Sequence, residues 1–154
     1  MSAEMLWKEL NETLPQPPTA GGNYLSAKRV GQMLYLAGVI SSGTDGVMTG
    51  TVGADRTVED GYAGARACAL MQMAVIRREL GSLDAVESVV SVNGYVNSVA
   101  GFADSPKVVN GASDLLVAVF GEAGRHVRAA VGVSGLPRNA VVEVQMVVLA
   151  KEGF

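Results

Sequence analysis

Cysteine and histidine, which build most nucleophilic and metal-binding sites, are almost absent: the 154 residues include one of each, Cys68 and His126. A single cysteine excludes an intrachain disulfide and fits a reducing compartment. Within a helical pattern, it is expected to be a small buried side chain rather than a nucleophile. A single histidine excludes a histidine-rich metal site within one chain, so we expect no metal. Taken alone, His126 is expected to be structural or to lie at the rim of a site.

Familiar catalytic motifs and basic surfaces are also missing. The chain has no CxxC, HExxH, GxxxxGK[ST] or GxSxG pattern, which excludes the common redox, zinc-peptidase, P-loop and nucleophile-elbow signatures. Charged residues make up only 18% and the formal net charge is −3, so we expect no nucleic-acid partner. The N-terminus has no basic region, long apolar run or cleavage site, so we expect a cytoplasmic protein without a membrane partner.

Apolar residues are plentiful instead. They make up 49% of the chain. At 154 residues the chain is long enough to bury a core without disulfides or structural metal ions, and we interpret residues 1–154 as one domain. Residues 1–18 are expected to form an N-terminal extension, with a short amphipathic helix over 3–12 and then an extended, proline-rich segment. Such an apolar composition also indicates surface that is buried against other subunits.

Cap and turn signals divide the rest of the chain into helices and strands. Residues 57–60 are typical of a capping box that opens a helix, which should end at Gly81. Ser105 and Pro106 indicate a second helix, with the serine as its cap and the proline at its first helical position, ending at Gly121. Strands are predicted at 25–28, 33–40 and 87–97.

The stretch from His126 to Ala150 is the most informative one. Its alternation of apolar side chains predicts two strands, which a turn at 136–139 would join as a hairpin. Each strand carries one charged residue among apolar neighbours, Arg128 and Glu143, and on the non-core face both would project into one region. An arginine can hold a carboxylate through two parallel hydrogen bonds, and a glutamate in a partly apolar pocket can act as a general base. The alternative is a cross-strand ion pair with no further role.

The order of these elements predicts an α+β fold, with two helices packed on one face of a single mixed sheet. The opposite face would carry residues that are too apolar and too small for a surface in water, namely Ala130, Gly132, Val141, Val147 and Leu149. Such a face must be covered, so we expect a closed homo-oligomer.

Several short segments make the chain resemble the YjgF-like (Rid, reactive intermediate deaminase) superfamily from about Pro18 onward. They are Gly22-Asn23-Tyr24, Ala37-Gly38-Val39-Ile40, Val109-Asn110, Arg128-x-x-Val131-x-Val133, Leu136-Pro137 and Val142-Glu143-Val144. The spacings within the C-terminal pair of strands carry the strongest part of the resemblance. The stretches 110–116 and 120–126 resemble a longer, less characterised branch of the superfamily.

The resemblance implies a chorismate-mutase-like fold and a homotrimer whose sheets form a central barrel, with sites in clefts between subunits and no metal or organic cofactor. In deaminating members, the residue matching Arg128 holds the carboxylate of a 2-imino or 2-enamino acid, and the residue matching Glu143 positions or activates the attacking water. Tyr24, Asn110 and the backbone at Gly38 match groups that line the cleft. Without the resemblance, Tyr24 could equally serve packing and Asn110 could face water.

Departures from the family pattern bear on the substrate. Ala37 and Val39 stand where the family commonly has a serine and a glutamine. Ala130, two residues after Arg128, stands where a hydroxyl or thiol is frequent. We therefore expect a roomier and less polar substrate-binding cleft.

Three functional hypotheses follow. The leading one is an enzyme that hydrolyses 2-imino and 2-enamino acids to 2-keto acids and ammonia. The second is a non-catalytic trimer that binds a small carboxylate as a sensor or scavenger. The third, an endoribonuclease or translation inhibitor, is a description often attached to this superfamily. The net negative charge of the chain argues against this third hypothesis, because a protein binds RNA largely by neutralising its phosphates with positive charge.

Overall fold

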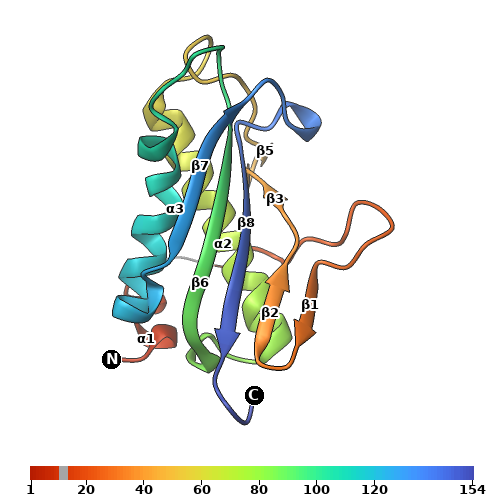
Figure 1. Cartoon of the computed structure of the whole chain (residues 1–154), viewed down its shortest axis with the longest axis vertical. Helices are drawn as coiled ribbons and strands as arrows, with labels where there is room; N and C mark the ends of the chain where they lie inside the picture. Colours follow the sequence, from red (N-terminus) through yellow and green to blue (C-terminus); the bar gives the residue numbers. More distant parts are fainter. Residues whose placement is uncertain (11–13) are drawn as a thin grey trace.

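A mixed β-sheet lies at the centre of the computed structural model, which describes residues 1–10 and 14–154 (Figure 1). Its strands run in the order β1-β2-β8-β6-β7, with β3 also paired to β8. Helices α2 and α3 cover one face, as the sequence predicted, and the other face is open. The sheet strands are β1 (Ala27–Val30), β2 (Met33–Leu36), β3 (Val39–Ile40), β6 (Val86–Asn97), β7 (Val127–Val133) and β8 (Val142–Ala150), and the remaining elements are α1 (Ala3–Glu9), β4 (Ser42–Gly43), β5 (Gly46–Val47), α2 (Val58–Leu80), η1 (Leu83–Ala85), α3 (Ser105–Phe120), η2 (Gly121–Gly124) and η3 (Pro137–Asn139).

The predicted capping box of α2 is confirmed. The amide of Thr57 donates to Asp60 Oδ2 over 2.8 Å, and the amide of Asp60 donates to Thr57 Oγ1 over 3.1 Å. The helix ends at Gly81, whose φ of 87° places it in the left-handed region that favours glycine. Local chemistry alone therefore fixed both ends of this helix.

Helix α3 begins one residue earlier than predicted. Its cap is Asp104, so Ser105 is already helical and Pro106 follows it in the first turn. Pro106 is tolerated in either register because the amides of the first turn have no partner within the helix. The Ser105 hydroxyl is buried and hydrogen-bonds to no described residue.

The predicted C-terminal hairpin is wrong, because β7 and β8 are not neighbours. Strand β6 lies between them, parallel to β7 and antiparallel to β8 (Figure 1). The connection at 134–141 crosses the end of β6, where the Asn97 side-chain amide donates to Asn139 Oδ1 and to the Ala140 carbonyl, each over 3.2 Å. Alternation along two strands establishes that they are strands, but it does not identify their partners.

The inserted strand changes which residues share a face. Val147 and Leu149 lie on the open face as predicted, whereas Ala130, Gly132 and Val141 face the helices instead. Ala130 and Gly132 pair with Gly94 and Val96, which belong to the helix-facing side of β6, and Val141 packs on Gly64 of α2. The open face carries other exposed apolar side chains, which are Val30, Tyr35, Val127 and Val131.

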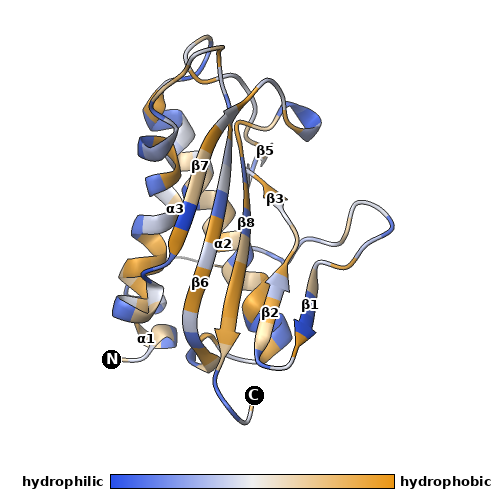
Figure 2. Cartoon of the chain, viewed as in Figure 1, coloured by the Kyte–Doolittle hydropathy of each residue, from blue (hydrophilic) through white to orange (hydrophobic). Residues whose placement is uncertain are grey.

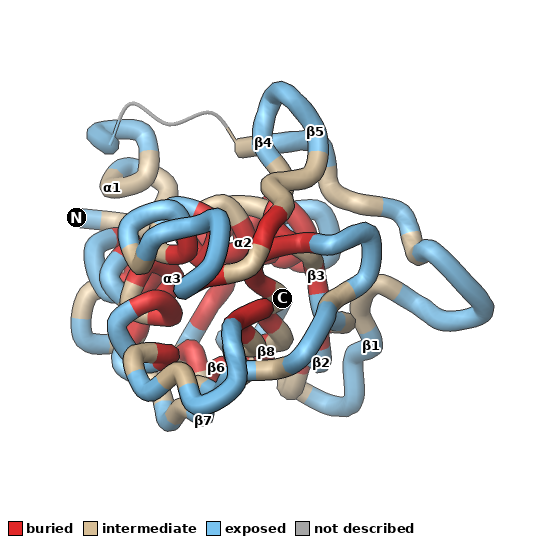
Figure 3. Tube along the Cα trace, turned by 90° about the horizontal axis from the view of Figure 1, so that it is seen from above, coloured by how far each residue is buried: buried red, intermediate tan, exposed pale blue. Residues whose placement is uncertain are grey.

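The core lies between the sheet and the two helices, where Figure 3 shows the buried segments. Strand β8 is hydrophobic along most of its length (Figure 2), and Val142, Val144, Met146 and Val148 are all buried. Cys68 is fully buried on α2, as expected, and burial raises the pKa of its thiol.

Helix α1, at the start of the N-terminal extension, packs on the outer side of the helical layer (Figure 3). Glu4 of α1 joins it to the body, since its Oε1 accepts from Arg77 Nε over 3.0 Å and from the Leu83 amide over 2.7 Å. Helix α1 ends at Glu9, and the end predicted at residue 12 lies outside the described residues. Over residues 1–10 and 14–154, no helix combines the length and the apolar character needed to cross a bilayer.

Candidate active site

Three of the predicted site residues line one cleft of about 540 Å³, which we call the Glu143 cleft. Glu143 projects from β8, Gly38 lies just before β3, and Tyr24 belongs to the loop that precedes β1. Residues 18–21, which lead out of the N-terminal extension, form a further wall. The Tyr24 hydroxyl accepts a hydrogen bond of 3.1 Å from the amide of Gly21, so the tyrosine also holds this wall in place.

A β-bulge between β2 and β3 opens the cleft. The sequence predicted one strand over 33–40, but the strand is interrupted at Ala37 and Gly38. Tyr35 pairs with Val147 and Val39 pairs with Val144. The four residue steps from position 35 to position 39 therefore stand opposite only three steps on β8. Such an extra residue bends the strand and leaves carbonyls without partners in the sheet.

Two glutamines supply the missing partners, and neither was predicted from the sequence as a site residue. Gln72, fully buried on α2, donates to the carbonyls of Ala37 and Val144 over 2.9 Å each. Gln145 of β8 donates to the carbonyl of Leu36 over 3.0 Å. Gln72 interrupts the apolar face of a helix, and that was the signal available in the sequence. Both amides stabilise the bulge that places Gly38 against Glu143.

Gly38 and Glu143 are in close contact. A Cβ atom at position 38 would lie 2.8 Å from Glu143 Oε2, so only glycine fits beside this carboxylate without displacing it. Burial raises the pKa of Glu143. No hydrogen bond or ion pair joins its carboxylate to another described residue. A half-buried, unpaired carboxylate at the wall of a cleft is suited to accept a proton from water or substrate.

Arg128 lies elsewhere, at the edge strand β7, and contacts a second predicted residue. Its Nη1 donates to Asn110 Oδ1 over 2.7 Å and to Ser113 Oγ over 3.1 Å, and its Nη2 donates to the Pro106 carbonyl over 3.3 Å. These bonds use three of the five N–H donors of a guanidinium, which leaves two for a ligand. Because it binds Arg128, Asn110 does not simply face water. Ala130, next on the same side of β7, is half-buried against the core.

Ser113 and His126 complete this second cluster. Ser113 Oγ lies 2.8 Å from His126 Nε2, and His126 Nδ1 lies 2.7 Å from the Gly124 carbonyl oxygen. Burial, with Arg128 as a smaller cause, lowers the pKa of His126. Ser113 was not predicted, although its position three residues after Asn110 places both on one side of a helix. His126 is half-buried beside a cleft of about 440 Å³, as expected for a residue at a rim.

The structure does not bring Arg128 and Glu143 together within one chain. Arg128 pairs with Val92 and faces the helices, whereas Glu143 pairs with Tyr95 and projects from the open face. Strand β6 also separates their strands. The alternative of a cross-strand ion pair is therefore excluded in the isolated chain. The predicted site residues form two separate half-sites, one around Glu143 and the other around Arg128.

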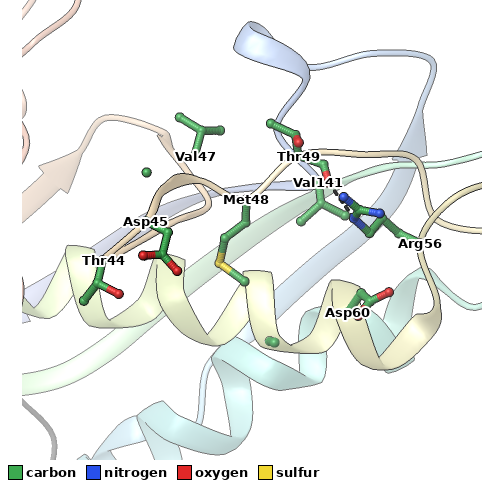
Figure 4. A pocket seen from close by; sticks show the side chains of 11 residues that line it. Thr44, Asp45, Val47, Met48, Thr49, Arg56, Asp60 and Val141 are labelled. Atoms are coloured by element: carbon green, nitrogen blue, oxygen red, sulfur yellow. Dashed lines mark hydrogen bonds between the residues drawn. The ribbon is translucent and has the colours of Figure 1, made fainter.

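A further cleft, of about 430 Å³, lies between the β4–β5 hairpin and α2 (Figure 4). Two of its three charged side chains already serve the backbone: Arg56 donates to the carbonyls of Thr49 and Asp55 over 2.8 Å each, and Asp60 belongs to the capping box, while the third is Asp45. In the described part of the chain, no group of three or more histidine, cysteine or acidic side chains could hold a metal ion.

This architecture and sequence match a known protein family. A family model described as YjgF/chorismate mutase-like, putative endoribonuclease, matches residues 9–150. The chain belongs to this family. Protein TCP17 of Trypanosoma cruzi is 44% identical over 143 residues, which span 92% of this chain and 89% of that protein.

Solved structures share this architecture. A protein of unknown function from Agrobacterium tumefaciens is 38% identical, with a TM-score of 0.87 over 96% of this chain and 91% of its own. A protein from Shewanella oneidensis, described as a putative endoribonuclease, is 31% identical, with a TM-score of 0.92 over 97% and 99%. RidA from an Antarctic Psychrobacter, 24% identical with a TM-score of 0.59 over 90% and 96%, shares the fold. The predicted YjgF-like α+β fold is thereby confirmed.

Proposed function

We propose that this YjgF-family protein is a deaminase that hydrolyses 2-imino and 2-enamino acids to 2-keto acids and ammonia. Its site would form between subunits of a homotrimer, where Arg128 of one subunit meets the Glu143 cleft of another. The observation that carries the proposal is the division into half-sites. Among the described residues, one chain holds a half-buried carboxylate without a partner and, separately, a fixed guanidinium with two unused donors. The half-site around Arg128 supplies a cation that can hold the substrate carboxylate, and the Glu143 cleft supplies the general base.

The open face of the sheet supports assembly. Val127 is 71% exposed and Val131 is 47% exposed, and Val30 and Tyr35 extend this apolar surface toward the other edge. A monomer would leave these side chains in water, whereas a closed ring of subunits buries such a surface on every copy. Because β7 is an edge strand, Arg128 would lie near the boundary with a neighbouring subunit.

The chemistry needs only the residues of the chain and water. The free donors of Arg128 hold the substrate carboxylate, and Glu143 takes a proton from a water molecule as that water attacks the imine carbon. The proton on Glu143 then passes to the nitrogen of the tetrahedral intermediate, ammonia leaves, and a 2-keto acid remains. One water is consumed and one ammonia is released for each imine.

The lining of the cleft favours apolar substrates. Ala37 and Val39 line the Glu143 cleft, and Ala130 lies beside Arg128 in the other half-site. We expect imino acids derived from leucine or methionine to be hydrolysed at least as well as the one derived from alanine. Competition between freshly generated imino acids, followed by release of each keto acid, measures this. A strong preference for the alanine- or serine-derived substrate would contradict it.

Two variants separate chemistry from binding. Arg128→Lys keeps the charge but loses the planar fork, so the ligand can tilt, and a misplacement of about 1 Å costs on the order of a hundredfold in rate. Glu143→Gln should be as inactive while it still binds a 2-keto acid, because the anchor is intact. Arg78→Lys, at an exposed arginine of α2 that lines neither half-site, is the matched control and should retain activity. Equal turnover by Glu143→Gln and wild type would refute the role of the glutamate.

A hybrid of the two inactive variants tests the division between subunits. Arg128→Lys and Glu143→Gln chains are co-expressed with different tags, and oligomers that carry both tags are purified. If each site takes Arg128 and Glu143 from different subunits, about a third of the sites in the purified mixed trimers have both wild-type residues and activity returns. If both residues came from one chain, no site would be complete and the hybrid would stay inactive.

Two other functions give different results in these assays. A carboxylate-binding protein without catalysis would bind 2-keto acids through Arg128 but never accelerate release of ammonia. An endoribonuclease, the description given to the Shewanella relative, would cleave RNA and lose affinity steeply with salt. The net charge of −3 does not favour that activity.

A further inference from the structure

Ser113 and His126 form a pair that the proposed deamination does not use. The serine lies in the middle of α3 and the histidine just before β7, and both line the cleft of about 440 Å³. The 2.8 Å between Ser113 Oγ and His126 Nε2 is within the range for proton transfer between a nucleophile and its base. Arg128 Nη1 lies 3.1 Å from the same serine oxygen.

The hydrogen bonds decide which nitrogen of His126 carries the proton. The Gly124 carbonyl can only accept, so the Nδ1–H group of His126 donates to it. In the neutral ring Nε2 is then the acceptor, and the Ser113 hydroxyl donates to it. The Gly124 carbonyl thus holds the ring in the tautomer that a general base requires, which is the role of the third group in a serine–histidine site.

The lowered pKa of His126 fits the same role, because it keeps the ring neutral near neutral pH. Arg128 adds the remaining requirement. A cation that donates to Ser113 Oγ stabilises negative charge as the hydroxyl loses its proton. Asn110 and Pro106 hold Arg128 in that position through two further hydrogen bonds.

From this arrangement we propose that Ser113 is a nucleophile, activated by His126 and Arg128, that accepts acyl groups from small esters. This activity goes beyond the proposed deamination and does not require Glu143. Ser113 Oγ forms a bond to the ester carbonyl carbon while its proton passes to His126 Nε2. The free N–H donors of Arg128 bind the oxyanion. The intermediate collapses with loss of the alcohol, which takes the proton from His126. Water, deprotonated by His126, then attacks the acyl carbon, Ser113 Oγ leaves and takes the proton back from His126, and the carboxylic acid is released.

Labelling with an alkyl fluorophosphonate tests the nucleophile directly. The probe transfers its phosphonyl group to an activated serine and releases fluoride. Intact mass measurement of the wild-type protein should show one adduct per chain, and peptide mapping should place it on Ser113. This mapping needs no variant, so the test holds even if a substitution disturbs the fold. No adduct, or an adduct on another residue, would overturn the proposal.

Variants then assign the base. His126→Gln cannot take up the proton and should label at least about a hundredfold more slowly, because general base catalysis commonly contributes that much. Ser113→Ala should not label, and Ser134→Ala, at an exposed loop serine, should label like wild type. Equal labelling of His126→Gln and wild type would refute the pair. Glu143→Gln should label normally while it loses deamination, so failure of one proposal is distinguishable from failure of the other.

Discussion

The contact between Gly38 and Glu143 allows the site to be perturbed by one methyl group. In Gly38→Ala the new Cβ atom would lie 2.8 Å from Glu143 Oε2, and ordinary contacts of a Cβ begin at about 3.4 Å. The carboxylate must therefore move by roughly 0.6 Å. Because a misplacement of about 1 Å can cost on the order of a hundredfold in rate, we expect kcat/KM for imine hydrolysis to fall by about tenfold.

The fold should tolerate this substitution. Gly38 does not adopt a left-handed backbone conformation, and the clashing atoms belong to the end of a side chain rather than to the backbone. The change in the free energy of unfolding should therefore stay within about 1 kcal/mol, because alanine also restricts the unfolded chain.

The assay follows ammonia release from freshly generated 2-imino acids and compares it with thermal unfolding. Gly43→Ala is the matched control, since no atom lies within 4 Å of a Cβ at that position. Wild-type activity in Gly38→Ala would show that the position of the Glu143 carboxylate does not matter and would refute its role as the base. A large loss of stability together with activity would show that Gly38 serves the fold instead.

Three further perturbations test other parts of the structure. Gly111→Ala places a Cβ 2.0 Å from the Tyr62 carbonyl oxygen, so α2 and α3 must separate, and denaturant unfolding should show a loss of about 3 kcal/mol or more. A loss below about 1 kcal/mol would contradict this close approach. Val147→Lys introduces a charge on the open sheet face, and light scattering should show dissociation or precipitation; an unchanged oligomer would place the interface elsewhere. Because burial raises the pKa of Glu143 and a base must be deprotonated, deamination should fall on acidification at a higher pH than an ordinary glutamate would set. A rate that stays constant down to about pH 4 would exclude Glu143 as the base.

The sequence by itself determined the elements whose causes are local. The capping box at Thr57 and Asp60 and the glycine after Leu80 bound a helix through hydrogen bonds and backbone preferences that act within a few residues. The alternation from Val142 to Val148 identified a strand and its buried side, because the period of side chains along a strand is two. Family motifs along the chain also led to the correct superfamily.

Only the tertiary structure decided how these elements combine. It placed β6 between β7 and β8, and the side of the sheet on which each charged side chain lies depends on that register. Arg128 therefore meets Asn110 and Ser113 of α3, while Glu143 meets Gly38 across the bulge. Pairing between distant strands is set by packing over the whole sheet, so local periodicity could find both residues but could not show that one chain holds them apart.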